Sequence, residues 1–267
     1  MPPRKVVIIP VYKNKLSGNE VNSITQCLKI LHNTPICFIC ANNFDFSNYN
    51  QFMQSGSKYY IERFKNKYFT SVLSYNKLLL SIAFYRRFKN YDYLLIYQLD
   101  AWVFKNELNY WCEKGYSYIG APWYEGWGMA DETSRFVAVG NGGFSLRDIK
   151  AHINVLEKYK YKALPQHYYN SFKRRPSFKT LKKLIIYLLT HKIPNTNYYW
   201  CNEDVFFGRI APKLFKNFLV PDVSTALQFA VEVNPELHVL EDRLPFGCHA
   251  WEKFQPEFWK KFIKIEA

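Results

Sequence analysis

The sequence predicts an α/β protein with a mostly parallel, Rossmann-like central sheet and flanking helices. Short apolar runs rich in β-branched residues alternate with segments of helical periodicity, and this alternation builds right-handed βαβ crossovers. The chain has 267 residues, of which 48% are hydrophobic, which is enough to fill the core of one large domain. Charged residues make up 22% of the chain, an ordinary share for a globular protein.

Four apolar runs in the first half are the predicted strands of this sheet. The first two are continuous rather than alternating, which is typical of strands that are buried on both faces. The four ranges are Lys5–Pro10, Pro35–Ala41, Lys58–Glu62 and Tyr93–Leu99. We expect one helix from Ser17, where Glu20 completes a capping box, and another from Ser71 to Phe88.

The second half is less regular, with a loop at residues 121–134 that is rich in Trp and Gly. Short strands are expected at Tyr118–Gly120 and Phe136–Val139. Helices are expected from about Asp148 to Tyr159, from Lys179 to His191 and from Cys201 to Ile210. No internal repeat or low-complexity linker divides the chain.

The formal charge of +14 is unevenly distributed along the chain. Residues 149–192 carry eleven Lys or Arg and one acid, Glu157, which gives +10 in this segment alone. A local basic segment indicates a patch that faces an anionic partner. A nucleic-acid partner is not expected, because no binding motif for DNA or RNA is present and the charge is localised.

Within that segment, the expected helix at 179–191 has Lys on one side and Leu, Ile and Tyr on the other. This pattern fits a helix lying on anionic lipid at the inner membrane face. The alternative, which we favour slightly, is that its apolar side packs on the domain and its lysines are solvated. Leu184–Leu189 is far shorter than a membrane span, and no signal-peptide segment opens the sequence. We therefore expect a cytoplasmic protein, peripheral on the membrane under the first interpretation.

The cysteine pattern favours buried thiols over a metal clip. Cys37 and Cys40 have CxxC spacing, but they lie inside a predicted strand. Two strand residues three apart point to opposite faces, which suits metal binding poorly. We expect the six cysteines to be reduced.

Four motifs contain residues that could take part in catalysis or bind a metal or ligand. Ligands bind at the carboxyl ends of parallel strands, so Asp100, directly after an apolar run, could hold a divalent cation or simply cap the next turn. The turn at Gly140–Arg147 (GNGGFSLR) permits close backbone approach to a ligand, or is a plain hairpin turn. In Trp200–Phe207 (WCNEDVFF), the two acids could include a general base or could serve a helix N-terminus. The histidine of Pro245–Trp251 (PFGCHAW) could complete a metal site or be structural.

In this order, the four motifs resemble the layout of GT-A glycosyltransferases. The strings IPVY, YQLDAW and YIGAPW, at Ile9–Tyr12, Tyr97–Trp102 and Tyr118–Trp123, resemble more narrowly a family of GT-A-like proteins catalogued as a domain of unknown function, DUF5672. The resemblance extends from about Lys5 to Trp251. It implies a GT-A (nucleotide-diphospho-sugar transferase) fold over 1–267 as a single domain, with a nucleotide-binding half at 1–102 and an acceptor-binding half at 103–267.

The resemblance also implies an activity. The protein would be a glycosyltransferase that moves a sugar from a nucleotide-diphosphate donor, with a UDP-sugar favoured, to a saccharide or lipid-linked saccharide acceptor in bacterial surface-glycan synthesis. Mn²⁺ or Mg²⁺ would bind at Asp100 and His249 and would stabilise the leaving diphosphate. The sequence departs from the family's Asp-X-Asp motif, because Trp102 stands where the second acid would be.

The same resemblance assigns roles to further residues. Asp204 would be the base of an inverting reaction, with Glu203 beside it binding acceptor hydroxyls, although the reverse assignment stays open. Further residues would bind the donor: Pro10, Val11 and Tyr12 as the wall for the base, Gly142 and Gly143 along the sugar, and Asn76 and Lys77 near the nucleotide. Two alternatives remain: a retaining transferase in which Asp204 orients the substrate, and a non-catalytic nucleotide-sugar or glycan-binding module, which the missing second acid supports.

Overall fold

The computed structural model describes residues 2–54, 59–131, 133–162, 176–178, 181–182, 185 and 202–265. Among them, the central sheet has six strands in the order β3-β2-β1-β4-β9-β6. Their bounds are β1 Lys5–Pro10, β2 Ile36–Ala41, β3 Tyr59–Phe64, β4 Tyr93–Tyr97, β6 Tyr118–Gly120 and β9 Phe144–Asp148. Only β9 runs against its neighbours in this sheet, which confirms the predicted α/β fold with a mostly parallel central sheet.

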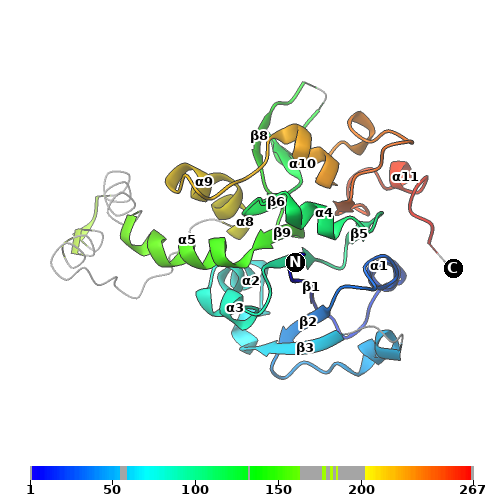
Figure 1. The fold of residues 1–267 in the computed structure, drawn as a ribbon, viewed down its shortest axis with the longest axis horizontal. Helices are drawn as coiled ribbons and strands as arrows, with labels where there is room; N and C mark the ends of the chain where they lie inside the picture. Colours follow the sequence, from blue (N-terminus) through cyan, green and yellow to red (C-terminus); the bar gives the residue numbers. More distant parts are fainter. Residues whose placement is uncertain are drawn as a thin grey trace.

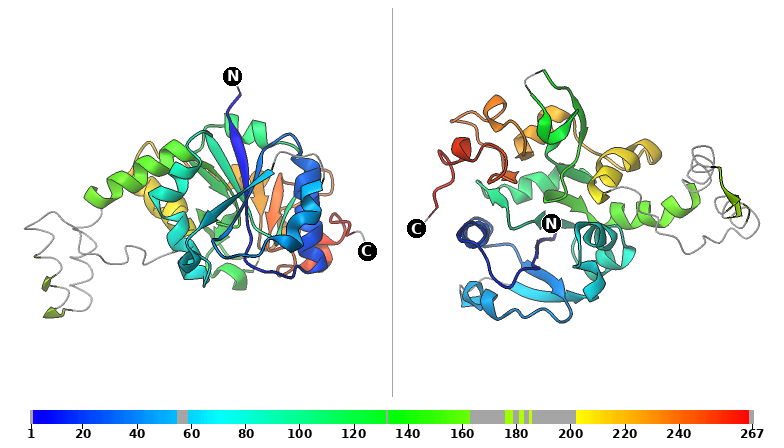
Figure 2. Two further views of the ribbon diagram at one scale, coloured as in Figure 1. Left: turned by 90° about the horizontal axis from the view of Figure 1, so that it is seen from below. Right: turned by 180° about the vertical axis from the view of Figure 1, so that it is seen from behind.

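Helices cover both faces of this sheet, as Figure 1 shows. On one face lie α1 (Gly18–Ile30) and α4 (Leu108–Glu113), and on the other lie α2 (Val72–Leu79), α3 (Ile82–Arg87) and α5 (Ile149–Lys162). In the left view of Figure 2, the twisted strands lie between these two layers. Each layer buries its own hydrophobic cluster against the sheet, so the sheet is apolar on both faces.

Local sequence signals explain where the first helices begin and end. The capping box of α1 is present: the Ser17 hydroxyl accepts a hydrogen bond from the Glu20 N–H, and the Glu20 carboxylate accepts one from the Ser17 N–H. The single helix predicted from Ser71 to Phe88 is wrong. It is split into α2 and α3 because the Ser81 side chain caps a new helix by accepting a hydrogen bond from the Phe84 N–H.

After Asp100 the chain returns to the central sheet in β6 and β9, and the described part of it also builds a smaller sheet and a hairpin. The smaller sheet has the order β10-β11-β5, and β7 pairs with β8. Their bounds are β5 Ala101–Val103, β7 Pro122–Tyr124, β8 Phe136–Val139, β10 Ala230–Val231 and β11 Gly247–His249. Helices α10 (Val223–Phe229) and α11 (Pro256–Trp259) lie nearby, and a third hydrophobic cluster includes Trp102, Trp251 and Trp259.

The helix predicted from Cys201 to Ile210 is not a continuous α-helix. It consists of α8 (Glu203–Val205), a π-helical turn at η4 (Phe206–Ile210) and α9 (Ala211–Leu214), and Cys201 lies outside the described residues. The remaining 3₁₀ turns are η1 Ser47–Gln54, η2 Asn66–Tyr68, η3 Trp127–Met129 and η5 Pro235–Leu237. The basic helix expected at 179–191 lies mostly outside the described residues, so its membrane-docking interpretation stays a prediction.

The described cysteines are buried free thiols: Cys27, Cys37, Cys40, Cys112 and Cys248. Burial raises the pKa of each of these thiols. The CxxC pair is therefore part of the core in β2, as predicted. Across the described helices, none combines the length and apolar character that a membrane span requires.

Loss of the α1 cap gives a first prediction about stability. Ser17→Ala should lower the free energy of unfolding by about 0.5–2 kcal/mol, because the Glu20 N–H loses its acceptor at the helix start. Urea unfolding measures the change, and Ser17→Thr, which keeps the hydroxyl, is the control. Equal losses in both variants would contradict the capping role.

Candidate functional site

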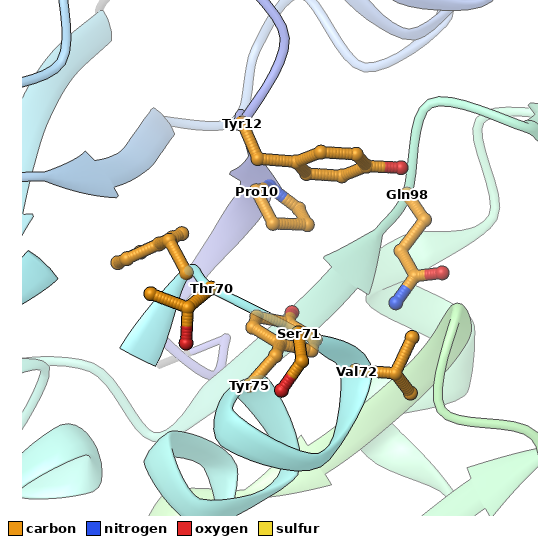
Figure 3. A pocket seen from close by; sticks show the side chains of 8 residues that line it. Pro10, Tyr12, Thr70, Ser71, Val72, Tyr75 and Gln98 are labelled. Atoms are coloured by element: carbon orange, nitrogen blue, oxygen red, sulfur yellow. The ribbon is translucent and has the colours of Figure 1, made fainter. Parts of the chain in front are cut away.

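Two adjoining cavities lie at the carboxyl ends of β1 and β4, where a parallel sheet places its ligands. The first, of ≈ 390 Å³, is lined by Pro10, Tyr12, Phe69, Thr70, Ser71, Val72, Tyr75 and Gln98 (Figure 3). The second, of ≈ 400 Å³, is lined mainly by polar and aromatic residues, among them Trp123, Trp127, Asn141, Gly142, Gly143, Glu203, Asp204, Glu232 and His249. The two cavities share Val72, Tyr75 and Gln98, so they adjoin along one cleft.

The first cavity contains two of the three residues predicted as a wall for the nucleotide base. In Figure 3, the Tyr12 ring and Pro10 lie on one side of the cavity, and the Gln98 amide lies on another. Tyr12 is 55% exposed, so a face of its ring is available for stacking. Val11 differs from its neighbours, because its side chain is buried in the core and its N–H donates to the Ile39 carbonyl.

The pairing of short strands brings Asp100 and His249 together from distant parts of the sequence. Strand β5 pairs antiparallel with β11 in a register that sets Ala101 opposite His249. Asp100 immediately precedes this pair, and its Oδ1 lies 3.2 Å from His249 Nε2. The two metal ligands predicted from the sequence are therefore neighbours.

A third residue, Glu232, holds the other side of the His249 ring. Strand β10 pairs with β11, with Val231 opposite Cys248, and this places Glu232 Oε1 2.9 Å from His249 Nδ1. Asn141 Nδ2 also lies 3.1 Å from that nitrogen. Sequence reasoning missed Glu232, although it shows the same signal as Asp100: an acid directly after a short apolar strand.

The chemistry around His249 fits a divalent cation. Its buried Nε2 faces the Asp100 carboxylate at 3.2 Å, while the Glu232 carboxylate orients Nδ1, the usual arrangement for a metal-ligating histidine. Burial lowers the pKa of His249, but Asp100 and Glu232 outweigh it and raise the pKa to about 10. A cation would therefore displace a proton from the ring. In the described ranges, no group of three or more His, Cys, Asp or Glu side chains is placed to hold a metal ion, so a cation at Asp100 and His249 would need ligands from the substrate and water.

The glycines of the turn after β8 allow two site residues to approach the backbone. A Cβ on Gly143 would lie 1.9 Å from His249 Nε2, and one on Gly142 would lie 2.2 Å from Glu203 Oε1. Any side chain at these positions would displace His249 or Glu203. Both glycines also line the second cavity, where the sequence predicted a wall for the donor sugar.

Glu203 is anchored by a buried ion pair with Arg147. Arg147 Nη1 and Nη2 each lie 2.9 Å from a different carboxylate oxygen of Glu203, and both side chains are almost completely buried. Arg147 also donates hydrogen bonds to Ser145 and Tyr85. Burial raises the pKa of Glu203 to about 7, although Arg147 pulls it down. The sequence flagged Glu203, but gave no sign that Arg147 would take both of its oxygens.

Among the residues that the structure describes, Asp204 borders the second cavity without a cationic partner in direct contact. Its Oδ2 accepts a hydrogen bond of 3.2 Å from the Gly142 N–H, and its Oδ1 accepts one of 2.8 Å from the Val205 N–H. Burial raises the pKa of Asp204, and these two N–H groups oppose that shift. A partly buried carboxylate with a raised pKa, open to a cavity, is suited to accept a proton.

Asn76 and Lys77 are adjacent on α2, but only Asn76 faces the cleft. The Asn76 Oδ1 accepts a hydrogen bond of 3.1 Å from the Glu203 N–H, and its Nδ2 lies 3.3 Å from Asn202 Oδ1. Asn76 thus fixes the start of α8 and also lines the second cavity. Lys77 lines neither of the two cavities.

The buried ion pair gives a second prediction. Arg147→Met should lower the free energy of unfolding by about 3–5 kcal/mol, because it leaves the Glu203 carboxylate buried without a counter-charge. The double variant Arg147→Met/Glu203→Met should recover most of this loss, because neither charge then remains. Urea unfolding compares the variants, and wild-type stability of the single variant would contradict the pairing.

Comparison with known proteins identifies a family and several solved structures of low identity. Residues 58–249 match the family described as "Protein of unknown function (DUF5672)". No curated protein sequence matches the chain. The apo-form glycosyltransferase GlyE of Streptococcus pneumoniae TIGR4 is 12% identical with a TM-score of 0.49, covering 99% of this chain and 61% of its own. Mouse xyloside xylosyltransferase 1, in its apo form, is 12% identical with a TM-score of 0.46, covering 92% of this chain and 96% of its own.

A third structure was solved with ligands. The mannosyltransferase PcManGT from Pyrobaculum calidifontis, in complex with GDP-Man and Mn²⁺, is 11% identical with a TM-score of 0.33, covering 45% of this chain and 36% of its own. This chain therefore spans about a third of the PcManGT chain, and less than two thirds of GlyE. Identities of 11–12% and TM-scores below 0.5 do not transfer an activity from these proteins to this chain.

The family match covers most of the chain and includes the segments that line the second cavity, whereas Pro10 and Tyr12 of the first cavity lie outside it. It spans Asp100, the turn at Gly142, the Glu203 and Asp204 pair, and His249. This agrees with the family resemblance of the sequence motifs, and the chain belongs to the DUF5672 family.

Proposed function

We propose that this protein is a glycosyltransferase that moves a sugar from a nucleotide-diphosphate donor to a saccharide acceptor, free or lipid-linked. The observation that carries the proposal is that Asp204, a carboxylate suited to accept a proton, lines the same cavity as His249, which lies against Asp100. A proton acceptor and a candidate cation site on one cleft are two elements that an inverting, cation-assisted glycosyl transfer from a diphosphate uses. The motif layout that resembles GT-A enzymes supports the same activity.

In this proposal, Asp100 and His249 would hold Mn²⁺ or Mg²⁺ at the donor diphosphate. When bound, the cation supplies Lewis-acid stabilisation of the leaving diphosphate. Glu232 keeps the His249 ring oriented with Nε2 toward Asp100. The single acid after β4 is sufficient here only because His249 and the donor's own oxygens share the coordination.

Asp204 is the proposed base of an inverting reaction. The acceptor hydroxyl oxygen forms a bond to the anomeric carbon while the bond from that carbon to the diphosphate oxygen breaks, and the hydroxyl proton passes to the Asp204 carboxylate. The Gly142 N–H holds this carboxylate at the cavity wall. Because Arg147 binds both oxygens of Glu203, we now assign Glu203 to positioning Asp204 rather than to binding acceptor hydroxyls.

The first cavity is the proposed place of the nucleotide, with a UDP-sugar as the favoured donor. Tyr12 would stack on the base beside Pro10, while Val11 would contribute through its backbone only. The donor sugar would then extend toward Gly142 and Gly143, and the acceptor toward the aromatic side chains of Trp123 and Trp127 in the second cavity. Asn76 acts by fixing the start of α8, and Lys77 receives no role.

Replacement of the base tests the activity itself. Asp204→Asn should reduce turnover of a UDP-, GDP- or dTDP-sugar with Mn²⁺ by about 10²–10⁴-fold, because the amide cannot accept the proton. Nucleotide binding, read from thermal shift, should be unchanged, because Asp204 does not line the first cavity. The exposed Asp242→Asn is the matched control.

Normal turnover by Asp204→Asn would refute its role as base. A wild-type protein that binds nucleotides but turns over none of these donors would instead favour the non-catalytic binding module. Retention of the donor's anomeric configuration in the product, read by NMR, would identify a retaining transferase.

The pH dependence of catalysis follows from the same carboxylate. The kcat/KM of transfer should fall as the pH is lowered through the pKa of Asp204, because the protonated form cannot act as a base. Burial raises that pKa, so the fall should occur at a higher pH than for an exposed aspartate. A pH profile of kcat/KM measures this, and a profile whose acid limb lies at or below the ordinary aspartate pKa would contradict it.

A further inference from the structure

The loop at residues 125–131 holds a bulky side chain in an unfavourable backbone conformation. Trp127 has a φ of 48°, in the left-handed region, directly after Gly126 with a φ of 80°. A tryptophan is rarely found there, because its Cβ crowds the backbone, and such a conformation persists only where surrounding contacts hold it. Trp127 nevertheless stays 49% exposed and lines the second cavity with Asp204.

Contacts to Trp127 and to the neighbouring backbone hold this loop in place, among them an edge-to-face contact with the Phe254 ring at 6.1 Å between ring centres. The Trp127 indole N–H donates a hydrogen bond of 3.3 Å to Glu232 Oε2. The Lys253 ammonium lies 4.8 Å from the centre of the Trp127 ring, and Asn234 Nδ2 donates to the Ala130 carbonyl at 3.2 Å. Glu232 is 5% exposed, so the Trp127 indole donates to a buried carboxylate, which makes this hydrogen bond costly to break.

The same carboxylate serves the candidate cation site with its other oxygen. Glu232 Oε1 binds His249 Nδ1 at 2.9 Å, while Oε2 binds Trp127. A carboxylate is a rigid, planar group that only accepts hydrogen bonds, so its two oxygens cannot move independently. Any displacement of the Glu232 carboxylate would shift both the His249 ring and the Trp127 indole.

We propose that Glu232 is a positioning residue that joins the cation site to the 125–131 loop, with one oxygen orienting His249 and the other holding Trp127 at the wall of the second cavity. The inference rests on the proposed function for its cation half, whereas the link to the loop is a property of the protein without ligands. The two oxygens of one buried side chain thus connect the donor side of the cleft with the side that contains Asp204.

Two measurements on the full chain test the proposal. The first is hydrogen exchange, read by mass spectrometry, of peptides that cover 125–131 in the metal-free protein. The second is the Kd for Mn²⁺, read from the electron paramagnetic resonance signal of free Mn²⁺. The variants are Glu232→Gln, which weakens both contacts, and Trp127→Phe, which keeps an aromatic ring but removes the indole N–H. The exposed Glu241→Gln is the matched control.

The expected pattern separates the two oxygens. Glu232→Gln should exchange severalfold faster than wild type at 125–131 and should bind Mn²⁺ about 10–100-fold more weakly. Trp127→Phe should show the faster exchange with an unchanged Mn²⁺ affinity. Unchanged exchange at β1 and α1 in both variants shows that the fold is intact, and Trp127→Phe keeps the loop test available if Glu232→Gln does not fold.

Wild-type exchange at 125–131 in both variants would overturn the proposal, and so would an unchanged Mn²⁺ affinity in Glu232→Gln. Failure of the proposed function is distinguishable from either result. A wild-type protein that binds no Mn²⁺ refutes the cation site and with it that half of the proposal, while exchange in the metal-free proteins still decides the link between Glu232 and Trp127.

Discussion

The pairing of β5 with β11 is the constraint on which the cleft depends. The chain leaves the central sheet at Asp100 and, over three residues, finds a partner strand from near the other end of the sequence. This register sets His249 beside Asp100, and the addition of β10 brings Glu232 behind the histidine. A slip of one residue would turn His249 to the opposite face of the small sheet, and the site would be lost.

The opposite wall of the cleft is fixed by a different kind of interaction. There, a buried ion pair between Arg147 and Glu203 ties the end of β9 to the start of α8, and Asp204 takes its place as the next residue along. The two walls meet at Gly142 and Gly143, where the missing side chains leave room for Glu203 and His249. The pairing of β5 with β11 and the buried ion pair between Arg147 and Glu203 therefore place side chains against the same turn, at Gly142 and Gly143.

The sequence predicted the parts of this structure that carry a long or repeated signal. Strands β1, β2 and β4 were recognisable because a strand buried on both faces is apolar throughout. Strands β5, β10 and β11 have only two or three residues each, too few to show a periodicity, and they were missed, although the equally short β6 was predicted. Helices α2 and α3 were predicted as one helix from Ser71 to Phe88, because the helical spacing of apolar residues continues across the cap at Ser81.

Chain order was enough to single out Asp100, Asp204 and His249, of which Asp100 and His249 are neighbours and Asp204 lines the same cavity as His249. The partner of Glu203 was not predictable, because pairing depends on distance and burial in the folded chain. Substitution history offers another view of that pair: neither Arg147 nor Glu203 can be exchanged alone without passing through a form with a stranded charge in a dry interior. Substitutions at these two positions are therefore expected to be correlated among relatives, whereas exposed positions around them are expected to vary independently.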